Sequence, residues 1–159
     1  MPSAPHLDLT EIDPARTVVG PESLRKVLKQ RGTFELLDRV VHFDAEVGTV
    51  AGVVPVRRDA WWAADHIPGR PLFPGALMIE AAAQLCTYHF LAAHPEFGDV
   101  FVGFGGLDGT RFRQTVEPDC DLLVVGLRKR VRSRMFTYSV QGYVDGTLVV
   151  ESDVLGVIL

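Results

Sequence analysis

The chain has 159 residues, of which 47% are hydrophobic and 23% charged, and its formal net charge at pH 7 is -4. This length suits one domain with its own hydrophobic core and is short for two. The negative net charge argues against a general nucleic-acid binder, because phosphate contacts require a surplus of Lys and Arg.

The first residues and the cysteines indicate the cellular compartment that we expect for the protein. Residues 1–20 contain no basic segment followed by an apolar one, so we expect no secretory signal, and we find no apolar run of membrane-spanning length. Cys86 and Cys120 are too few for a disulfide framework or a metal cluster, which favours a reducing cytoplasm. We expect residues 1–20 to form a poorly ordered arm, or one ordered by a partner subunit, and residues 21–159 to form a single domain.

The first regular elements are predicted between Pro21 and residue 56. Leu24, Val27 and Leu28 share one face of a helix that begins at Pro21 and stops at Gly32. Residues 34–43 and 49–56 then have the composition of strands, joined by a turn at 44–48.

A rigid loop and a long helix are predicted next. Residues 57–74 contain Pro68, Pro71 and Pro74, which exclude regular structure and stiffen the chain. Residues 75–93 form the longest helical segment, about 28 Å long. This segment is rich in alanine and almost free of charge, so we expect burial on most sides.

The remainder of the chain has the pattern of strands. Asp145-Gly146 is a strong hairpin signal between two of them. One buried helix followed by antiparallel strands indicates an α+β domain, with the sheet wrapped over the helix. The predicted strands are 100–104, 106–112, 122–127, 136–144 and 148–157.

The segment from His66 to Glu80 carries the residues best suited to chemistry. A histidine on a stiff loop can take a proton near neutral pH. Pro74-Gly75 leaves free N–H groups at a helix start, where they can stabilise an oxyanion. A carboxylic acid kept protonated by burial, as at Glu80, can donate a proton to a departing hydroxyl. Together these groups suit removal of a proton next to a carbonyl. A purely structural alternative is that Gln84, one turn after Glu80, satisfies its carboxylate.

Several segments occur in a characteristic order along the chain: Leu28–Val40, which ends in a Leu-x-Asp-Arg-Val strand, His66–Gly69, Pro74-Gly75, Glu80–Gln84, Phe104–Asp108, Arg111–Arg113 and Val144–Gly146. With these segments, the sequence from Leu24 to its end resembles the FabZ-type 3-hydroxyacyl-acyl-carrier-protein dehydratases. The His-to-Glu spacing of 14 residues is that of the family.

The resemblance implies a hotdog fold, in which an antiparallel sheet wraps a long central helix. It also implies a homodimer at minimum, often a trimer of dimers, with the histidine and the glutamate of one site coming from different subunits. By this resemblance His66 abstracts the C2 proton, Glu80 protonates the 3-hydroxyl, and the Gly75 amide polarises the thioester carbonyl. The product is a trans-2-enoyl thioester. No metal or redox cofactor is implied, because the acyl group arrives on phosphopantetheine, borne by acyl carrier protein or coenzyme A. Glutamate rather than aspartate at position 80 favours dehydration without isomerisation.

Four segments depart from the family pattern. Asp65 stands where glycine is usual, and its carboxylate could favour the charged form of His66 or change the loop. Trp61 and Trp62 belong to a segment that replaces Asn-Glu-x-Phe-Phe, and they could narrow the acyl tunnel or pack in the core. The other two departures are Lys29–Thr33, in place of Pro-His-Arg-x-Pro, and Pro118–Asp121, in place of Pro-Gly-Asp.

Two groups of basic residues are candidate contacts for an acidic carrier protein. The first is Arg128, Lys129, Arg130, Arg132 and Arg134, which could equally be the solvated end of a hairpin. The second is Arg57, Arg58 and Arg70, closer in sequence to the His66 loop.

Two other functions stay open at this point. One is a non-catalytic acyl-binding hotdog subunit, against which the presence of both His66 and Glu80 argues. The other is a hotdog thioesterase, whose enzymes also use a helix carboxylate but lack the His-x-Pro-Gly loop as a signature. Cys86, beyond Glu80 on the same helix, is expected to be a small core residue.

Overall fold

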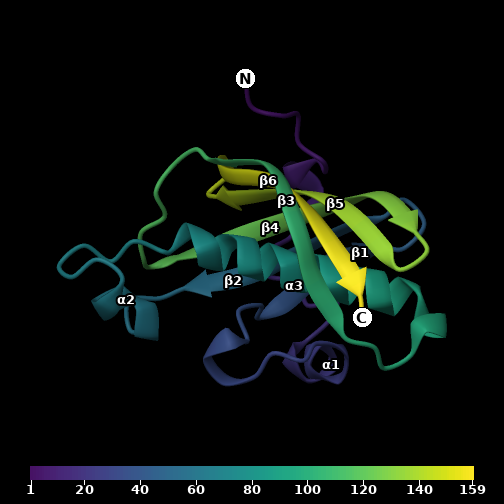
Figure 1. Cartoon of the computed structure of the whole chain (residues 1–159). Helices are drawn as coiled ribbons and strands as arrows, with labels where there is room; N and C mark the ends of the chain where they lie inside the picture. The colour runs from purple at the N-terminus through teal and green to yellow at the C-terminus, as the bar shows by residue number, and fades with distance from the viewer.

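The fold is one antiparallel sheet packed against one long helix, and the computed structural model describes residues 1–159. The sheet has six strands in the order β1-β2-β4-β5-β6-β3. Figure 1 shows α3 lying across one face of this sheet. The hotdog fold expected from the sequence is confirmed.

The strands are β1 (Arg39–Asp44), β2 (Thr49–Val56), β3 (Val102–Phe112), β4 (Cys120–Arg132), β5 (Met135–Val144) and β6 (Thr147–Ile158). The helices are α1 (Pro21–Val27), α2 (Trp61–Asp65) and α3 (Gly75–Ala93), with 3-10 turns η1 (Leu9–Glu11), η2 (Gly32–Phe34) and η3 (Pro95–Phe97).

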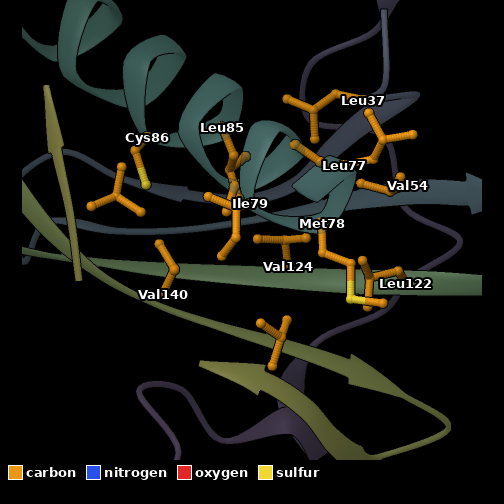
Figure 2. Close-up of a cluster of buried hydrophobic side chains, with 14 of the residues drawn as sticks. Leu37, Val54, Leu77, Met78, Ile79, Leu85, Cys86, Leu122, Val124 and Val140 are labelled. Carbon is orange, nitrogen blue, oxygen red and sulfur yellow. The ribbon is translucent and has the colours of Figure 1, made fainter. Parts of the chain in front are cut away.

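Helix α3 forms the centre of the hydrophobic core. Its side chains Met78, Ile79 and Leu85 point toward β2 and β4, as Figure 2 shows. By length and composition α3 could span a membrane, which corrects the expectation that no segment reaches that length. However, 61% of its most apolar window is buried inside the protein, as in the core helix of a globular domain.

The sheet is apolar on both faces, because successive side chains of a strand point to opposite sides. In β2, Val50 and Val54 pack in the core beneath α3, whereas Ala51 and Val53 belong to a separate cluster on the outer face. That outer cluster contains Val41, Ala51, Val53, Val125 and Tyr143. A second layer is therefore needed to cover the outer face.

The N-terminal arm, residues 1–20, supplies part of this second layer. Leu7, Leu9 and Ile12 pack against the outer cluster. The backbone N–H of His6 donates to Gln141 Oε1 at 2.9 Å, and Val19 pairs with Val40 as an isolated bridge. These contacts join the arm to β1, β5 and the outer cluster of its own chain.

Several predicted boundaries differ from the structure. Helix α1 ends at Val27 instead of continuing to Gly32, and β4 extends beyond the predicted 122–127 at both ends. Residues 34–38 are not strand, because η2 turns the chain before β1 begins at Arg39. The loop 57–74 is not wholly irregular, since α2 forms a single short helix ahead of the prolines. The segments 100–104 and 106–112 are one strand, β3, whose register shifts twice against β6.

Candidate active site

His66 lies at the end of α2, where the loop fixes the orientation of its ring. Its Nδ1 is 2.8 Å from the carbonyl oxygen of Leu72. A carbonyl oxygen can only accept a hydrogen bond, so Nδ1 must carry the proton. In the neutral ring Nε2 then has a free lone pair. The residue is exposed, and its Nε2 makes no hydrogen bond within the chain. The loop therefore presents His66 as a proton acceptor.

Glu80 lies on the face of α3 that also carries Ala83, Gln84 and Thr87, a spacing that places all four on one side of a helix. These residues line an open pocket of about 100 Å³, whose other walls are Gln30 and parts of β3, β5 and β6. Its apolar lining includes Phe104, Phe136 and Leu155. The candidate acid thus borders a small, partly apolar cavity.

Gln84 fixes one oxygen of the Glu80 carboxylate. Its Nε2 donates to Glu80 Oε1 at 2.9 Å and to the backbone carbonyl of Phe34, also at 2.9 Å. The Gln84 side chain is almost fully buried, at 2% exposure. The hydrogen bond that we expected as the structural alternative is therefore present. It leaves the second carboxylate oxygen, Oε2, without a partner in the chain, so it is compatible with a catalytic role as well.

Gly75 is the first residue of α3, and the helix start has no side-chain cap. The N–H groups of Gly75 and Ala76 make no hydrogen bond in the chain, whereas Leu77 and Met78 donate to the carbonyl of Pro74. A Cβ on residue 75 would lie 2.7 Å from the Phe112 ring, so glycine is required by close packing. This helix start offers two free donors and the positive end of the α3 dipole to an oxyanion.

One chain does not bring His66 and Glu80 into one cavity. The residues that line the Glu80 cavity come from α3, from Gln30 and from β3, β5 and β6, and His66 is not among them. Strand β3, beside this cavity, is an edge of the sheet. It exposes Phe104, Leu107 and Phe112 by 49%, 43% and 54%. An unpaired edge with exposed aromatic side chains is a typical place for a second chain to pair.

Asp65, the last residue of α2, is exposed and makes no hydrogen bond or ion pair with His66. The partner of the His66 ring is instead the Leu72 carbonyl, which the sequence could not identify because it is a backbone group.

The two groups of basic residues lie at opposite ends of β4. Arg57 and Arg58 follow β2, whose last residue pairs with Cys120 at the start of β4. They form ion pairs with Asp121 and Asp119 respectively, and Arg70 pairs with Glu117. At the other end, Lys129 pairs with Asp153, and Arg128 and Arg134 donate to backbone carbonyls. Only Arg130 and Arg132, of these eight, make no side-chain hydrogen bond or ion pair.

The two tryptophans and Cys86 make packing contacts or lie in the core. Trp62 is buried and contacts Phe73, with ring centroids 5.1 Å apart, whereas Trp61 is 47% exposed and stacks on Phe34. Cys86 is fully buried, and burial strongly raises the pKa of its thiol, as expected for a core residue. No group of three or more His, Cys, Asp or Glu side chains is placed to hold a metal ion.

Comparison with known proteins identifies the class of protein and then its family. Solved structures with the same fold include a dehydratase heterocomplex, ApeI:P, from Xenorhabdus doucetiae, with a TM-score of 0.73 and 16% identity over 86% of this chain and 90% of that one. A mutant thioesterase from Pseudomonas aeruginosa matches with a TM-score of 0.68 and 13% identity over 92% and 99% of the two chains. The class is therefore that of hotdog-fold proteins.

The sequence comparisons are more specific. Residues 28–153 match the model of the FabA-like domain. The 3-hydroxyacyl-[acyl-carrier-protein] dehydratase FabZ of Thermomicrobium roseum is 32% identical over 86% of this chain and 90% of its own length. The FabZ of Desulfotalea psychrophila is 34% identical over 81% and 86%. The chain belongs to the FabA-like family, and the resemblance stated from the sequence is confirmed.

Proposed function

We propose that this protein is a 3-hydroxyacyl-[acyl-carrier-protein] dehydratase, which converts 3-hydroxyacyl thioesters to trans-2-enoyl thioesters in fatty-acid or related lipid synthesis. The hydrogen bond between His66 Nδ1 and the Leu72 carbonyl carries this proposal. It leaves Nε2 as the basic nitrogen of an exposed ring, as removal of a C2 proton requires. Its relatives named as FabZ dehydratases support the same reaction.

The proposed reaction uses three groups of the chain. His66 Nε2 takes the C2 proton, and the electron pair of that C–H bond forms the C2–C3 double bond. The C3–O bond breaks, its electrons go to the hydroxyl oxygen, and Glu80 supplies the proton that makes water. The Gly75 N–H donates to the thioester carbonyl while negative charge develops there. His66 then loses and Glu80 regains a proton. No redox or metal step is needed, and phosphopantetheine delivers the acyl group as part of the substrate.

The active unit that we propose is a homodimer, with His66 and Glu80 of one site on different subunits. The β3 edge and its exposed side chains support this arrangement, because pairing two such edges would cover them. A trimer of dimers stays a prediction from the family resemblance.

The carrier that we propose is acyl carrier protein, with coenzyme A thioesters as the alternative. Arg130 and Arg132 are the better docking candidates, because their guanidinium groups are unpaired within the chain. Arg57, Arg58 and Arg70 already face carboxylates, so an acidic partner would have to compete with these. We place the enzyme in the cytoplasm, where its substrates and free thiols would be expected.

The test is to supply a 3-hydroxyacyl thioester of acyl carrier protein to the purified protein and to identify the product by mass spectrometry. We expect an enoyl thioester whose mass is lower by one water. Free carrier thiol with released acid would instead indicate a thioesterase. Binding without turnover would indicate a non-catalytic acyl-binding subunit, and both of these outcomes contradict the proposal.

A further inference from the structure

The start of α3 is held by the segment that follows β3. A Cβ on residue 75 would lie 2.7 Å from Cε1 of Phe112, so the Phe112 ring lies directly against Gly75. Two residues before Gly75, the backbone N–H of Phe73 donates to the carbonyl oxygen of Val116 at 2.8 Å. Helix α3 has no side-chain cap at this end. The position of its free N–H donors therefore depends on contacts with residues 112–116.

A buried ion pair on the opposite face of the sheet fastens this segment. Phe112 pairs with Val150, whose side chain lies in the core, so the Phe112 ring points to the inner face. The next residue, Arg113, points to the outer face, where its Nε donates to Glu151 Oε1 at 3.1 Å and its Nη2 donates to the same oxygen. The two side chains are 29% and 12% exposed, so salt screens this ion pair less than a surface pair. The segment is thus anchored on the face away from α3.

The N-terminal arm completes this ion pair. The backbone N–H of Ser3 donates to the second carboxylate oxygen of Glu151, Oε2, at 3.3 Å. The carbonyl oxygen of Met1 accepts a hydrogen bond from Arg113 Nη2 at 3.4 Å. Both partners of the ion pair therefore bond to the first three residues of the chain. A series of contacts runs from the arm, through the ion pair and the end of β3, to the start of α3.

We propose that the Arg113–Glu151 ion pair, completed by the arm, positions the Gly75 N–H as the donor to the thioester oxygen, an inference that rests on the proposed dehydratase function. The ion pair acts through Phe112, whose ring packs on Gly75. Such donors stabilise an oxyanion because they are already aimed at the place where its charge develops. A displacement of about 1 Å can reduce the rate about a hundredfold. Arg113, Glu151 and Phe112 are therefore positioning residues that act through Gly75.

The experiment compares Glu151→Gln and Phe112→Leu with their double variant in the enoyl-forming assay. Glu151→Gln keeps the shape of the side chain but removes its charge, and Phe112→Leu removes the ring. We expect kcat to fall about three- to tenfold in Glu151→Gln and about tenfold or more in Phe112→Leu, with KM within about twofold, because the donor acts mainly in the transition state. The double variant should be no slower than Phe112→Leu alone, because the ion pair acts through this ring.

Two sets of control variants separate positioning from a general loosening of the fold. Ser139 Oγ lies 2.9 Å from Nε2 of His6, so Ser139→Ala removes another contact of the arm and leaves the ion pair in place. Its kcat should stay within about twofold of the wild type. Arg113→Lys keeps the charge and should retain more of kcat than Arg113→Met. Urea unfolding of every variant ensures that folded proteins are compared.

NMR of protein with isotope-labelled glycine measures the same coupling without turnover. The ring current of Phe112 shifts the amide resonance of Gly75. Glu151→Gln should move this resonance toward its position in Phe112→Leu, whereas Ser139→Ala should leave it in place. If the dehydratase function fails, the wild type forms no enoyl product, and the Gly75 resonance still tests the coupling.

Two results would overturn the inference. A double variant slowed by the product of the two single effects would mean that the ion pair and the Phe112 ring act independently. An unchanged Gly75 resonance in Glu151→Gln, or an unchanged kcat beside a wild type that forms the enoyl product, would mean that the ion pair does not position the start of α3.

Discussion

Replacing Gln84 by leucine tests how Glu80 is held. The substitution keeps the approximate volume of a side chain that is 2% exposed, but removes both hydrogen bonds of its Nε2. The bond to the Phe34 carbonyl contributes about 0.5–1.5 kcal/mol. The bond to Glu80 contributes about 0.5–1.5 kcal/mol when the carboxyl group is protonated, and about 1.5–3 kcal/mol when it is charged. Glu80 is partly exposed, which weakens this second contribution. We expect the free energy of unfolding to fall by about 1–3 kcal/mol in total.

Urea unfolding at pH 7 measures this loss, with Gln114→Leu as the exposed control that should change stability by less than about 0.5 kcal/mol. A double-mutant cycle with Glu80→Ala separates the bond to the carboxylate from the bond to Phe34, because only the first couples the two positions. A coupling energy near zero, or a Gln84→Leu variant as stable as the control, would refute the claim that Gln84 holds Glu80.

Three further predictions follow from other parts of the structure. Tyr138→Phe removes the hydroxyl that lies 2.6 Å from Nδ1 of the buried His89, and should cost about 1–3 kcal/mol in urea unfolding; an unchanged midpoint would contradict this. Burial lowers the pKa of His89 and of His6, so the folded protein binds fewer protons than the unfolded chain below the ordinary histidine pKa of about 6.5. The free energy of unfolding should therefore fall as the pH is lowered from about 6.5, and the slope should become smaller in His89→Gln. Deleting residues 1–17 uncovers the outer cluster around Val53, and should lower the unfolding midpoint and produce larger species in size-exclusion chromatography; a deletion variant of unchanged stability and size would show that the arm adds nothing.

The parts of the fold that depend on local chemistry were predicted closely. The sequence predicts the helix 75–93 with the bounds that the structure shows, because its apolar run follows Pro74 and ends where the composition changes. Asp145 and Gly146 have φ values of 48° and 76°, the left-handed pair that the hairpin signal predicts. In contrast, helix α2 was not predicted. Its five residues lie directly before a proline-rich loop and are too few to show a helical pattern of their own.

The candidate site was predicted in its side chains but not in their partners. The sequence predicts His66, Gly75 and Glu80 as site residues, because it contains the motif with the spacing of the family. The Leu72 carbonyl and the position of Gln30 depend on how distant segments meet, which periodicity does not reveal. The pairing of Arg57 with Asp121 has the same origin, since it follows from the register between β2 and β4.

The most direct test of the central claim mixes two inactive variants. His66→Ala and Glu80→Gln should each lack enoyl formation when expressed alone. In a mixed dimer, one site combines both defects and the other is intact, so co-expressed protein should recover about a quarter of the wild-type rate. Recovery would establish His66 and Glu80 as the catalytic pair and place them on different subunits. Activity of either variant alone, or a mixture that stays inactive beside an active wild type, would contradict the account.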